Sequence, residues 1–365
     1  MRVRVLVGGA ATCVALLAGG AVLAGAAAAT VPTEGSGGSG LGPGTVVVAD
    51  LEVPVLATFE LRGRQDDEGP QVRGVVHGVQ RVEGGTALYY SLGATGDEDV
   101  YGFQIFPQAA AVRDVGTAWD VRLVDAANLR AYRPLRTDDG LAVVKDEVFD
   151  GRSGQLHVGW AVFPELPDGV DAVQVVMPNG TVAGEVEVRD GALGPVVDAD
   201  TVRPGEGWPA LPDAAVLATA DPDEVSYVLT RRSSDLEQEV TVEESPEQVG
   251  VSLDASVAFA FDSADLTADA QARLAQVAAD IAARGTGEVV VTGHTDSDGD
   301  AAYNQSLSEQ RAQAVVAALA PGPGSAVTFT AVGRGEDEPV ADNGTEEGKK
   351  ANRRVTVVYS VEGDR

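Results

Sequence analysis

A carboxylate and a guanidinium at fixed spacing, on Asp296 and Arg311, are the side chains best suited to bind a charged ligand. The predicted strand 288–293 would deliver Asp296 into a loop at the edge of a sheet. Ser308 is the predicted N-cap of the following helix, with Leu307 before it as a hydrophobic staple and Arg311 in the first turn. Unpaired amides at a helix N-terminus favour an anionic group. A ligand that carries an ammonium and a carboxylate close together would satisfy all three features.

The elements that must position these side chains follow from hydrophobic spacing and capping residues. Thr267 can cap a helix, Leu274 and Ile281 share one apolar face, and Gly285 can end it. Pro321 stops a second helix. The predicted elements in chain order are a strand at 256–261, a helix at 267–285, a strand at 288–293, the helix before 321, and strands at 326–332 and 354–361. This βαβαββ order predicts an α+β domain with two helices on one face of a mixed sheet.

A family resemblance becomes specific in the same segment. The matching positions are Thr292-Gly293-His294-Thr295-Asp296, Gly299, Tyr303-Asn304, Leu307-Ser308, Arg311-Ala312, with Phe259-Ala260-Phe261-Asp262-Ser263 upstream and Gly333-Arg334-Gly335-Glu336 and Asn352-Arg353-Arg354-Val355 downstream. Residues 251–362 resemble the OmpA C-terminal-like family of peptidoglycan-binding domains. The resemblance implies a non-catalytic domain that binds the cell wall.

The resemblance also implies a ligand and a role for each side chain. The ligand in this family is the diamino acid of the peptidoglycan stem peptide, usually meso-diaminopimelate. Asp296 would accept from its ammonium and Arg311 would bind its carboxylate as a fork, a geometry that suits arginine. The residues implied to line the pocket are Thr295, Asn304, Leu307 and Arg353. Two alternatives stay open: a wall that contains lysine or ornithine, which lack the second carboxylate, and a purely structural ion pair between Asp296 and Arg311.

Neither a metal nor a cofactor is predicted. The three histidines, His77, His157 and His294, have no ligand spacing, and His294 is predicted to be structural. Aspartates at positions 296, 298 and 300 resemble the start of a calcium loop. Such a loop requires Gly at its sixth position and Glu at its twelfth, where this chain has Ala301 and Leu307.

The first residues are typical of an export signal. Arg2 and Arg4 precede an apolar run that closes on small residues, which predicts a signal peptide at 1–29. A retained membrane anchor is the alternative, because the run is just long enough to span. Cys13 lies inside the run and not after it, so lipidation is not expected. Residues 30–44, rich in Gly, Ser and Pro, predict a flexible linker.

The remaining chain predicts a multidomain protein. Short alternating runs between turns, as at 156–162, 173–176 and 182–188, predict an antiparallel β-sandwich at 45–190. Its pattern of short strands and turns resembles the immunoglobulin-like modules of exported actinobacterial proteins. Its partner would be an unidentified protein. Residues 191–250, acidic and rich in Pro, predict a connector.

Charge and missing motifs narrow the function classes. The formal net charge is −30 at pH 7, so the chain offers no basic face for nucleic acid. No G-x-S-x-G elbow, H-E-x-x-H motif or cysteine nucleophile accompanies the predicted sandwich, so an enzyme is not expected. We therefore expect an exported peptidoglycan-binding protein of the cell envelope. The alternatives are a wall-targeted enzyme with its activity in the N-terminal region and a membrane-anchored envelope tether.

Overall fold

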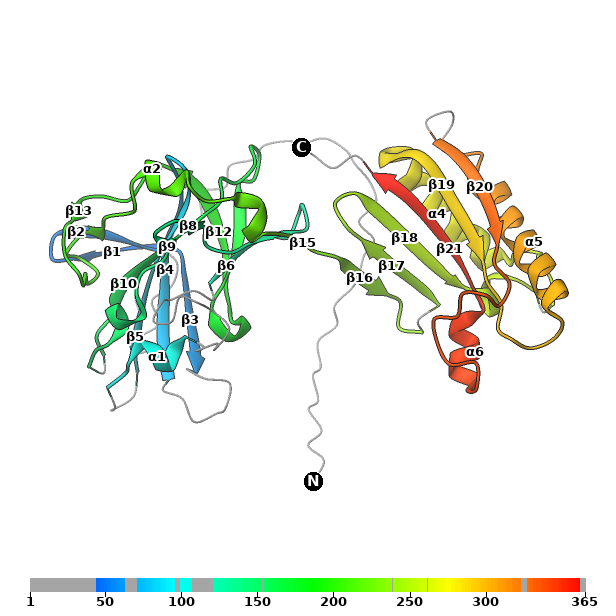
Figure 1. The fold of residues 1–365 in the computed structure, drawn as a ribbon, viewed down its shortest axis with the longest axis horizontal. Coiled ribbons are helices and arrows are strands. Elements are labelled where there is room, and N and C mark those ends of the chain that lie inside the picture. Colours follow the sequence, from blue (N-terminus) through cyan, green and yellow to red (C-terminus); the bar gives the residue numbers. More distant parts are fainter. Residues whose placement is uncertain are drawn as a thin grey trace, which may run out of the picture.

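The protein folds around two large sheets, one in each half of the chain (Figure 1). The computed structural model describes residues 44–62, 71–95, 99–106, 121–152, 154–237, 239–260, 262–322 and 327–361. The predicted signal peptide and all of the predicted linker except Gly44 lie outside these ranges. Within them, no helix combines the length and the apolar character that a membrane span requires.

The described residues of the N-terminal half form strands and single-turn helices. A nine-stranded sheet contains, in spatial order, β10 (His157–Phe163), β5 (Gly85–Ala94), β4 (Gln71–Val82), β12 (Val182–Asp190), β11 (Ala172–Val176), β6 (Arg122–Asp125), β7 (Arg130–Tyr132) and β15 (Ser226–Val228), while β3 (Ala57–Arg62) pairs with β4. Three small pairs accompany it: β1 (Gly44–Val48) with β2 (Leu51–Val55), β8 (Arg136–Thr137) with β9 (Gly140–Leu141), and β13 (Val196–Val197) with β14 (Trp208–Pro209). The short helices are α1 (Gly102–Ile105), η1 (Asp146–Phe149), η2 (Pro178–Gly180), α2 (Ala214–Leu217) and η3 (Pro222–Val225).

The predicted strands at 156–162, 173–176 and 182–188 are confirmed as β10, β11 and β12. Their pairing is less simple than an antiparallel sandwich, because β12 runs parallel to β4. Alternating apolar residues define which face of a strand is buried, but not which strand lies next to it or in which direction. The region is strand-rich as expected, and its assignment as an immunoglobulin-like sandwich stays a prediction.

Residues 191–250, the expected connector, are divided between the two sheets. The first part packs on the N-terminal sheet, where Val202, Trp208 and Leu217 are buried. The Trp208 ring makes edge contacts with His77 and Tyr89, with ring centroids 5.1 and 5.6 Å apart. The second part forms strands of the C-terminal sheet. Local sequence patterns in this region are few, so its packing against distant strands was not predicted.

The C-terminal sheet is mixed and has six strands. In spatial order these are β16 (Arg231–Ser234), β17 (Val240–Glu244), β18 (Gln248–Asp254), β21 (Arg354–Val361), β19 (Gly285–Gly293) and β20 (Val327–Gly333), all antiparallel to their neighbours except β19 and β20. The helices are α3 (Ala255–Ala258), α4 (Ala268–Arg284), α5 (Ala301–Leu319) and α6 (Glu346–Asn352). Helices α4 and α5 contact each other and both contact β19, so they cover the same face, as predicted.

Capping accounts for both the agreement and the differences in this half. Thr267 caps α4 as expected, with its hydroxyl accepting from the Ala270 amide at 3.2 Å, and α4 ends before Gly285. The predicted strand at 256–261 is wrong, because Asp254 accepts from the Ser256 amide at 2.8 Å and starts α3 there. The strand of this region is β18, and the short helix α6, between β20 and β21, was not predicted.

Candidate functional site

The loop that follows β19 is fixed from both sides by backbone hydrogen bonds. The His294 amide donates to the carbonyl of Arg354 at 2.9 Å, and the Thr295 amide donates to the carbonyl of Gly335 at 2.8 Å. Gly293 brings β19 against α5, since a Cβ there would lie 2.1 Å from the Ser308 carbonyl oxygen. Asp296 therefore leaves a rigid end of the sheet, as the sequence predicted.

Asp296 is engaged on both carboxylate oxygens. Its Oδ2 accepts from Nη1 of Arg353 at 2.6 Å, and its Oδ1 accepts from the Asp298 amide at 3.1 Å. The residue is 8% exposed, while the Arg353 side chain keeps 32% of its surface. Arg353 reaches the loop from the residue before β21, so Asp296 pairs with Arg353 and not with Arg311.

Helix α5 begins earlier than the sequence predicted. Its N-cap is Asp300, whose Oδ1 accepts from the amides of Ala302 and Tyr303 at 3.0 and 3.1 Å. The prediction that Ser308 is the N-cap is therefore wrong, because an earlier aspartate already satisfies the free amides. Ser308 is fully buried inside the helix and accepts from the Gly335 amide at 2.9 Å. The first helical turn is not beside Arg311.

Arg311 lies about three turns into α5 and is 7% exposed. Its Nε donates to the carbonyl of Ser263 at 3.0 Å, and its guanidinium carbon lies 5.2 Å from the centroid of the Phe259 ring. Among the described residues, its two terminal nitrogens have no hydrogen-bond acceptor, and neither is sealed from solvent. One edge of the guanidinium is thus anchored while the other is free to bind a ligand.

Opposite and like charges act on the Arg311 guanidinium. Burial is the main cause that lowers the pKa of Arg311, while the carboxylates of Asp262 and Asp296 raise it and the charge of Arg353 lowers it. Arg311, Asp296 and Arg353 are therefore within electrostatic reach of one another. The two charged residues of the sequence prediction are therefore near each other, and the ligand site that they would form stays a prediction.

The other predicted site residues differ in what they do. Nδ2 of Asn304 donates to the Glu336 carboxylate at 2.8 Å and to the carbonyls of Asp296 and Asp298 at 3.3 and 3.0 Å, so it ties the loop to α5. Oγ1 of Thr295 is buried and has no partner among the described residues. Leu307 is half-buried one turn before Arg311.

Several contributing residues were absent from the sequence prediction of the site. The Tyr303 hydroxyl donates to Oδ1 of Asp262 at 2.7 Å, and both groups act on the charge of Arg311. Glu336 holds Asn304, and Lys349 pairs with Asp298 at 2.9 Å. Tyr303, Asp262 and Glu336 lie inside the motif segments, and this location in the sequence could have identified them.

His294 is 3% exposed, and its Nδ1 has no partner among the described residues. Burial, assisted by the positive charges of Arg354 and Arg334, lowers its pKa from 6.5 to about 4. The imidazole is therefore neutral near pH 7. It fills the space under the loop without adding charge to the site.

The fold and the site define a mixed-sheet domain with two covering helices and a cluster of charged side chains where β19, α5 and β21 meet. A model of the OmpA family matches residues 258–353. The chain is 36% identical over 121 residues to the putative lipoprotein YfiB of Escherichia coli, covering 32% of this chain and 74% of that one. The chain belongs to the OmpA family.

Two further proteins are similar to about a third of this chain or less. The peptidoglycan-associated lipoprotein of Pseudomonas putida is 39% identical over 97 residues, which is 27% of this chain and 58% of that protein. The structure of the cell wall anchor of the T6SS from Pseudomonas aeruginosa is 37% identical, covers 34% of this chain and 90% of that one, and has a TM-score of 0.32. Other curated relatives match over only 14% to 58% of their own length.

Proposed function

We propose that this protein is an exported, non-catalytic component of the cell envelope that binds peptidoglycan non-covalently through its C-terminal pocket. The observation that carries the proposal is the free edge of Arg311. A guanidinium anchored by one nitrogen, with its two terminal donors unpaired among the described residues, matches the two oxygens of a carboxylate. The relative named a peptidoglycan-associated lipoprotein supports this ligand, and the export pattern at 1–29 supports the location.

The diamino acid of a diaminopimelate-type stem peptide is the proposed ligand. Its side chain ends in an ammonium and a carboxylate on the same carbon. The carboxylate would bind Arg311, and the ammonium would donate to the Asp296 carboxylate, which has lone pairs beyond those used by Arg353 and the Asp298 amide. Thr295, Asn304 and Leu307 would line the pocket. Lysine and ornithine offer no carboxylate to Arg311.

The test is sedimentation of the full chain with purified diaminopimelate-type sacculi. We expect Asp296→Ala and Arg311→Ala to abolish co-sedimentation. Arg334→Ala is the matched control, since Arg334 is half exposed and, among the described residues, forms an ion pair only with Glu338, at 3.3 Å. Circular dichroism would confirm that each variant is folded. If both pocket variants sediment like the wild type, the assigned pocket is wrong. A release of soluble wall fragments during incubation would contradict the non-catalytic proposal.

A further inference from the structure

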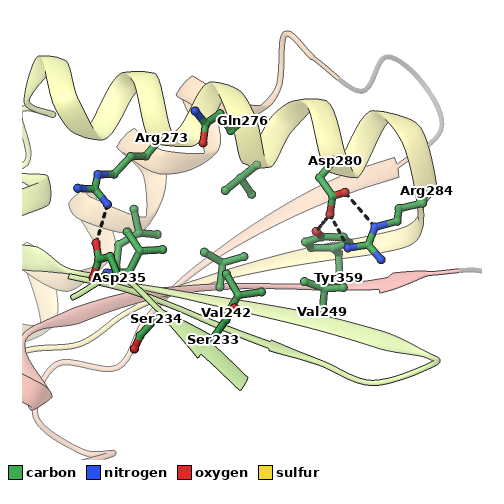
Figure 2. A pocket seen from close by; sticks show the side chains of 14 residues that line it. Ser233, Ser234, Asp235, Val242, Val249, Arg273, Gln276, Asp280, Arg284 and Tyr359 are labelled. Carbon is green, nitrogen blue, oxygen red and sulfur yellow. Dashed lines mark hydrogen bonds and ion pairs between the residues drawn. The ribbon is translucent and has the colours of Figure 1, made fainter. Parts of the chain in front are cut away.

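A second cavity lies in the C-terminal half, away from the Asp296 pocket. It has a volume of about 400 Å³ and is bounded by α4 on one side and by strands β16, β17, β18 and β21 on the other (Figure 2). We call it the α4 groove. None of the six predicted pocket residues lines it, and strands β16, β17 and β18 precede the matched segment 258–353. Its volume is within the range of ligand-binding pockets.

The floor of the α4 groove is apolar. Val240 pairs across the sheet with Leu253, and Val242 pairs with Val251, so two rows of aliphatic side chains face α4. Val277 of α4 closes the roof above them. Val240, Val242 and Val277 are only partly buried, although the groove lies between two packed elements. Additional aliphatic groups placed here would be removed from water, which is favourable.

Charged clusters stand at both ends of the α4 groove. At one end, Arg273 donates to Asp235 at 2.8 Å and to Glu239 at 3.2 Å, and Asp269 lies at 4.0 Å. Three carboxylates around one guanidinium leave a net charge of about −2 there. At the other end, Glu244 and Asp280 pair with two arginines, Arg231 and Arg284, so the charges balance. An occupant of the groove should therefore be cationic at the Arg273 end.

One border of the α4 groove is the terminal strand of the sheet. β16 is the terminal strand of the sheet, and its four residues are all exposed. Its last two residues, Ser233 and Ser234, line the groove and carry no charge. Bulky or charged side chains are a common protection against pairing at an edge. The first two residues of β16, Arg231 and Arg232, are charged, but each pairs with a glutamate of β17. Ser233 and Ser234 therefore mark the part of the edge that no charged or bulky side chain of β16 protects against an added strand.

We infer that the α4 groove and the edge of β16 together bind an extended, basic peptide segment of a partner protein. The segment would pair with β16 as an additional strand, a common mode of peptide recognition. Because strand side chains alternate, every second side chain would stand beside Ser233 on the face that carries Val242 and would reach into the groove from its border, and these would be aliphatic. A Lys or Arg would lie beside Asp235, Glu239 and Asp269. A second copy of this chain is a poor occupant, since both copies would carry a net charge of −30.

The probe is a fluorescent synthetic peptide of alternating Lys and Val, titrated against the full chain by anisotropy at about 150 mM salt, where long-range attraction is screened. Val242→Trp fills the groove, and Thr241→Trp is the matched control on the opposite face of β17. We expect Val242→Trp to weaken binding at least tenfold and Thr241→Trp to change it less than twofold. A Glu-Val peptide should bind at least tenfold more weakly than the Lys-Val peptide. Equal affinity of Val242→Trp and the wild type, or of the two peptides, overturns the inference.

Hydrogen exchange of the wild-type chain gives a readout that needs no variant. The Lys-Val peptide should slow exchange of amides at 231–235 and leave those at 294–312 unchanged. Binding without protection at 231–235 overturns the inference. Asp296→Ala, which tests the peptidoglycan pocket, should not alter peptide binding, so failure of one proposal is distinguishable from failure of the other.

Discussion

Arg311→Gln combined with a change of ligand gives the sharpest test of the pocket. Glutamine keeps a good helix former at this position of α5 but removes the two terminal donors. In the wild type, the Ser263 carbonyl and the Phe259 ring hold the guanidinium in one orientation. Binding a carboxylate therefore costs little additional side-chain entropy. The variant should weaken a ligand only where that ligand has a carboxylate for Arg311 to bind.

The expected magnitude follows from burial. Truncating one partner of a buried, hydrogen-bonded charge pair costs about 2–5 kcal/mol. Because the free edge of Arg311 keeps contact with solvent, the lower half of that range applies, at about 2–3 kcal/mol. This corresponds to a loss of about 30- to 150-fold in the affinity for a diaminopimelate stem peptide. For a lysine stem peptide the expected loss is below about 1 kcal/mol, or about fivefold.

The assay is isothermal titration calorimetry of the full chain with soluble stem peptides of both types. Wild type and Arg311→Gln, each with two ligands, form a cycle whose coupling energy isolates the contact between the guanidinium and the carboxylate. Arg334→Gln removes a nearby exposed charge and controls for long-range electrostatics. A loss of the same factor for both ligands would refute the assignment of Arg311 to the carboxylate.

Three further predictions concern residues that hold the site in place. Asn304→Ala removes the donor to Glu336 and to two loop carbonyls. We expect a loss of about 1–3 kcal/mol in the free energy of unfolding by urea, together with weaker ligand binding. Unchanged binding would show that the loop holds Asp296 in place without the Asn304 side chain. Because burial keeps the pKa of His294 at about 4 against 6.5, the unfolded chain alone takes up a proton as the pH falls from 6.5 to 4. The free energy of unfolding should fall by up to about 3 kcal/mol over that window, and His294→Gln should flatten the profile; identical slopes would contradict this. Gly293→Ala places a Cβ 2.1 Å from the Ser308 carbonyl and should destabilise the sheet by about 3 kcal/mol or more in thermal unfolding, whereas Gly250→Ala, with its nearest contact at 3.9 Å, should cost less than about 1 kcal/mol.

The elements that the sequence predicted well have local signals. Thr267 and Gly285 bound α4 because capping and termination depend on residues within one turn. Strand β21 coincides with the predicted 354–361, where alternating Val355, Val357 and Tyr359 are buried. Such patterns are visible because one face of each element meets an apolar core.

Helix α5 was misplaced at its start for a physical reason. Its inward face near the site carries Asn304, Ser308 and Arg311, all buried and all polar. Apolar periodicity is the signal that identifies a helix, and here the side chains that serve the site replace it. Ser308 is therefore a plausible cap in sequence, although it is a buried hydrogen-bonding residue in the structure.

In the expected connector, residues 191–250, the buried residues give no periodic pattern in the sequence. Trp208 and Leu217 are buried against strands that lie far earlier in the chain, so no local period announces their packing. In the strands of the β16–β17 hairpin, the apolar residues are Val240 and Val242, and the apolar floor of the α4 groove becomes evident only when β18 and α4 are placed beside them. Tertiary contacts of this kind cannot be predicted from windows of sequence.

The arrangement of charges also separates a ligand pocket from a structural ion pair. If Asp296 and Arg311 existed to bind each other, the carboxylate would accept from Arg311, but its short ion pair of 2.6 Å is with Arg353. Arg311 is left with a backbone carbonyl and an aromatic face, in an environment that lowers its pKa mainly through burial. A guanidinium held in this way lacks the anion that best offsets its loss of water. A ligand carboxylate would supply that anion, and its ammonium would reach an Asp296 already oriented by Arg353. The unpaired edge of Arg311 therefore favours the proposed ligand site over a structural ion pair between Arg311 and Asp296.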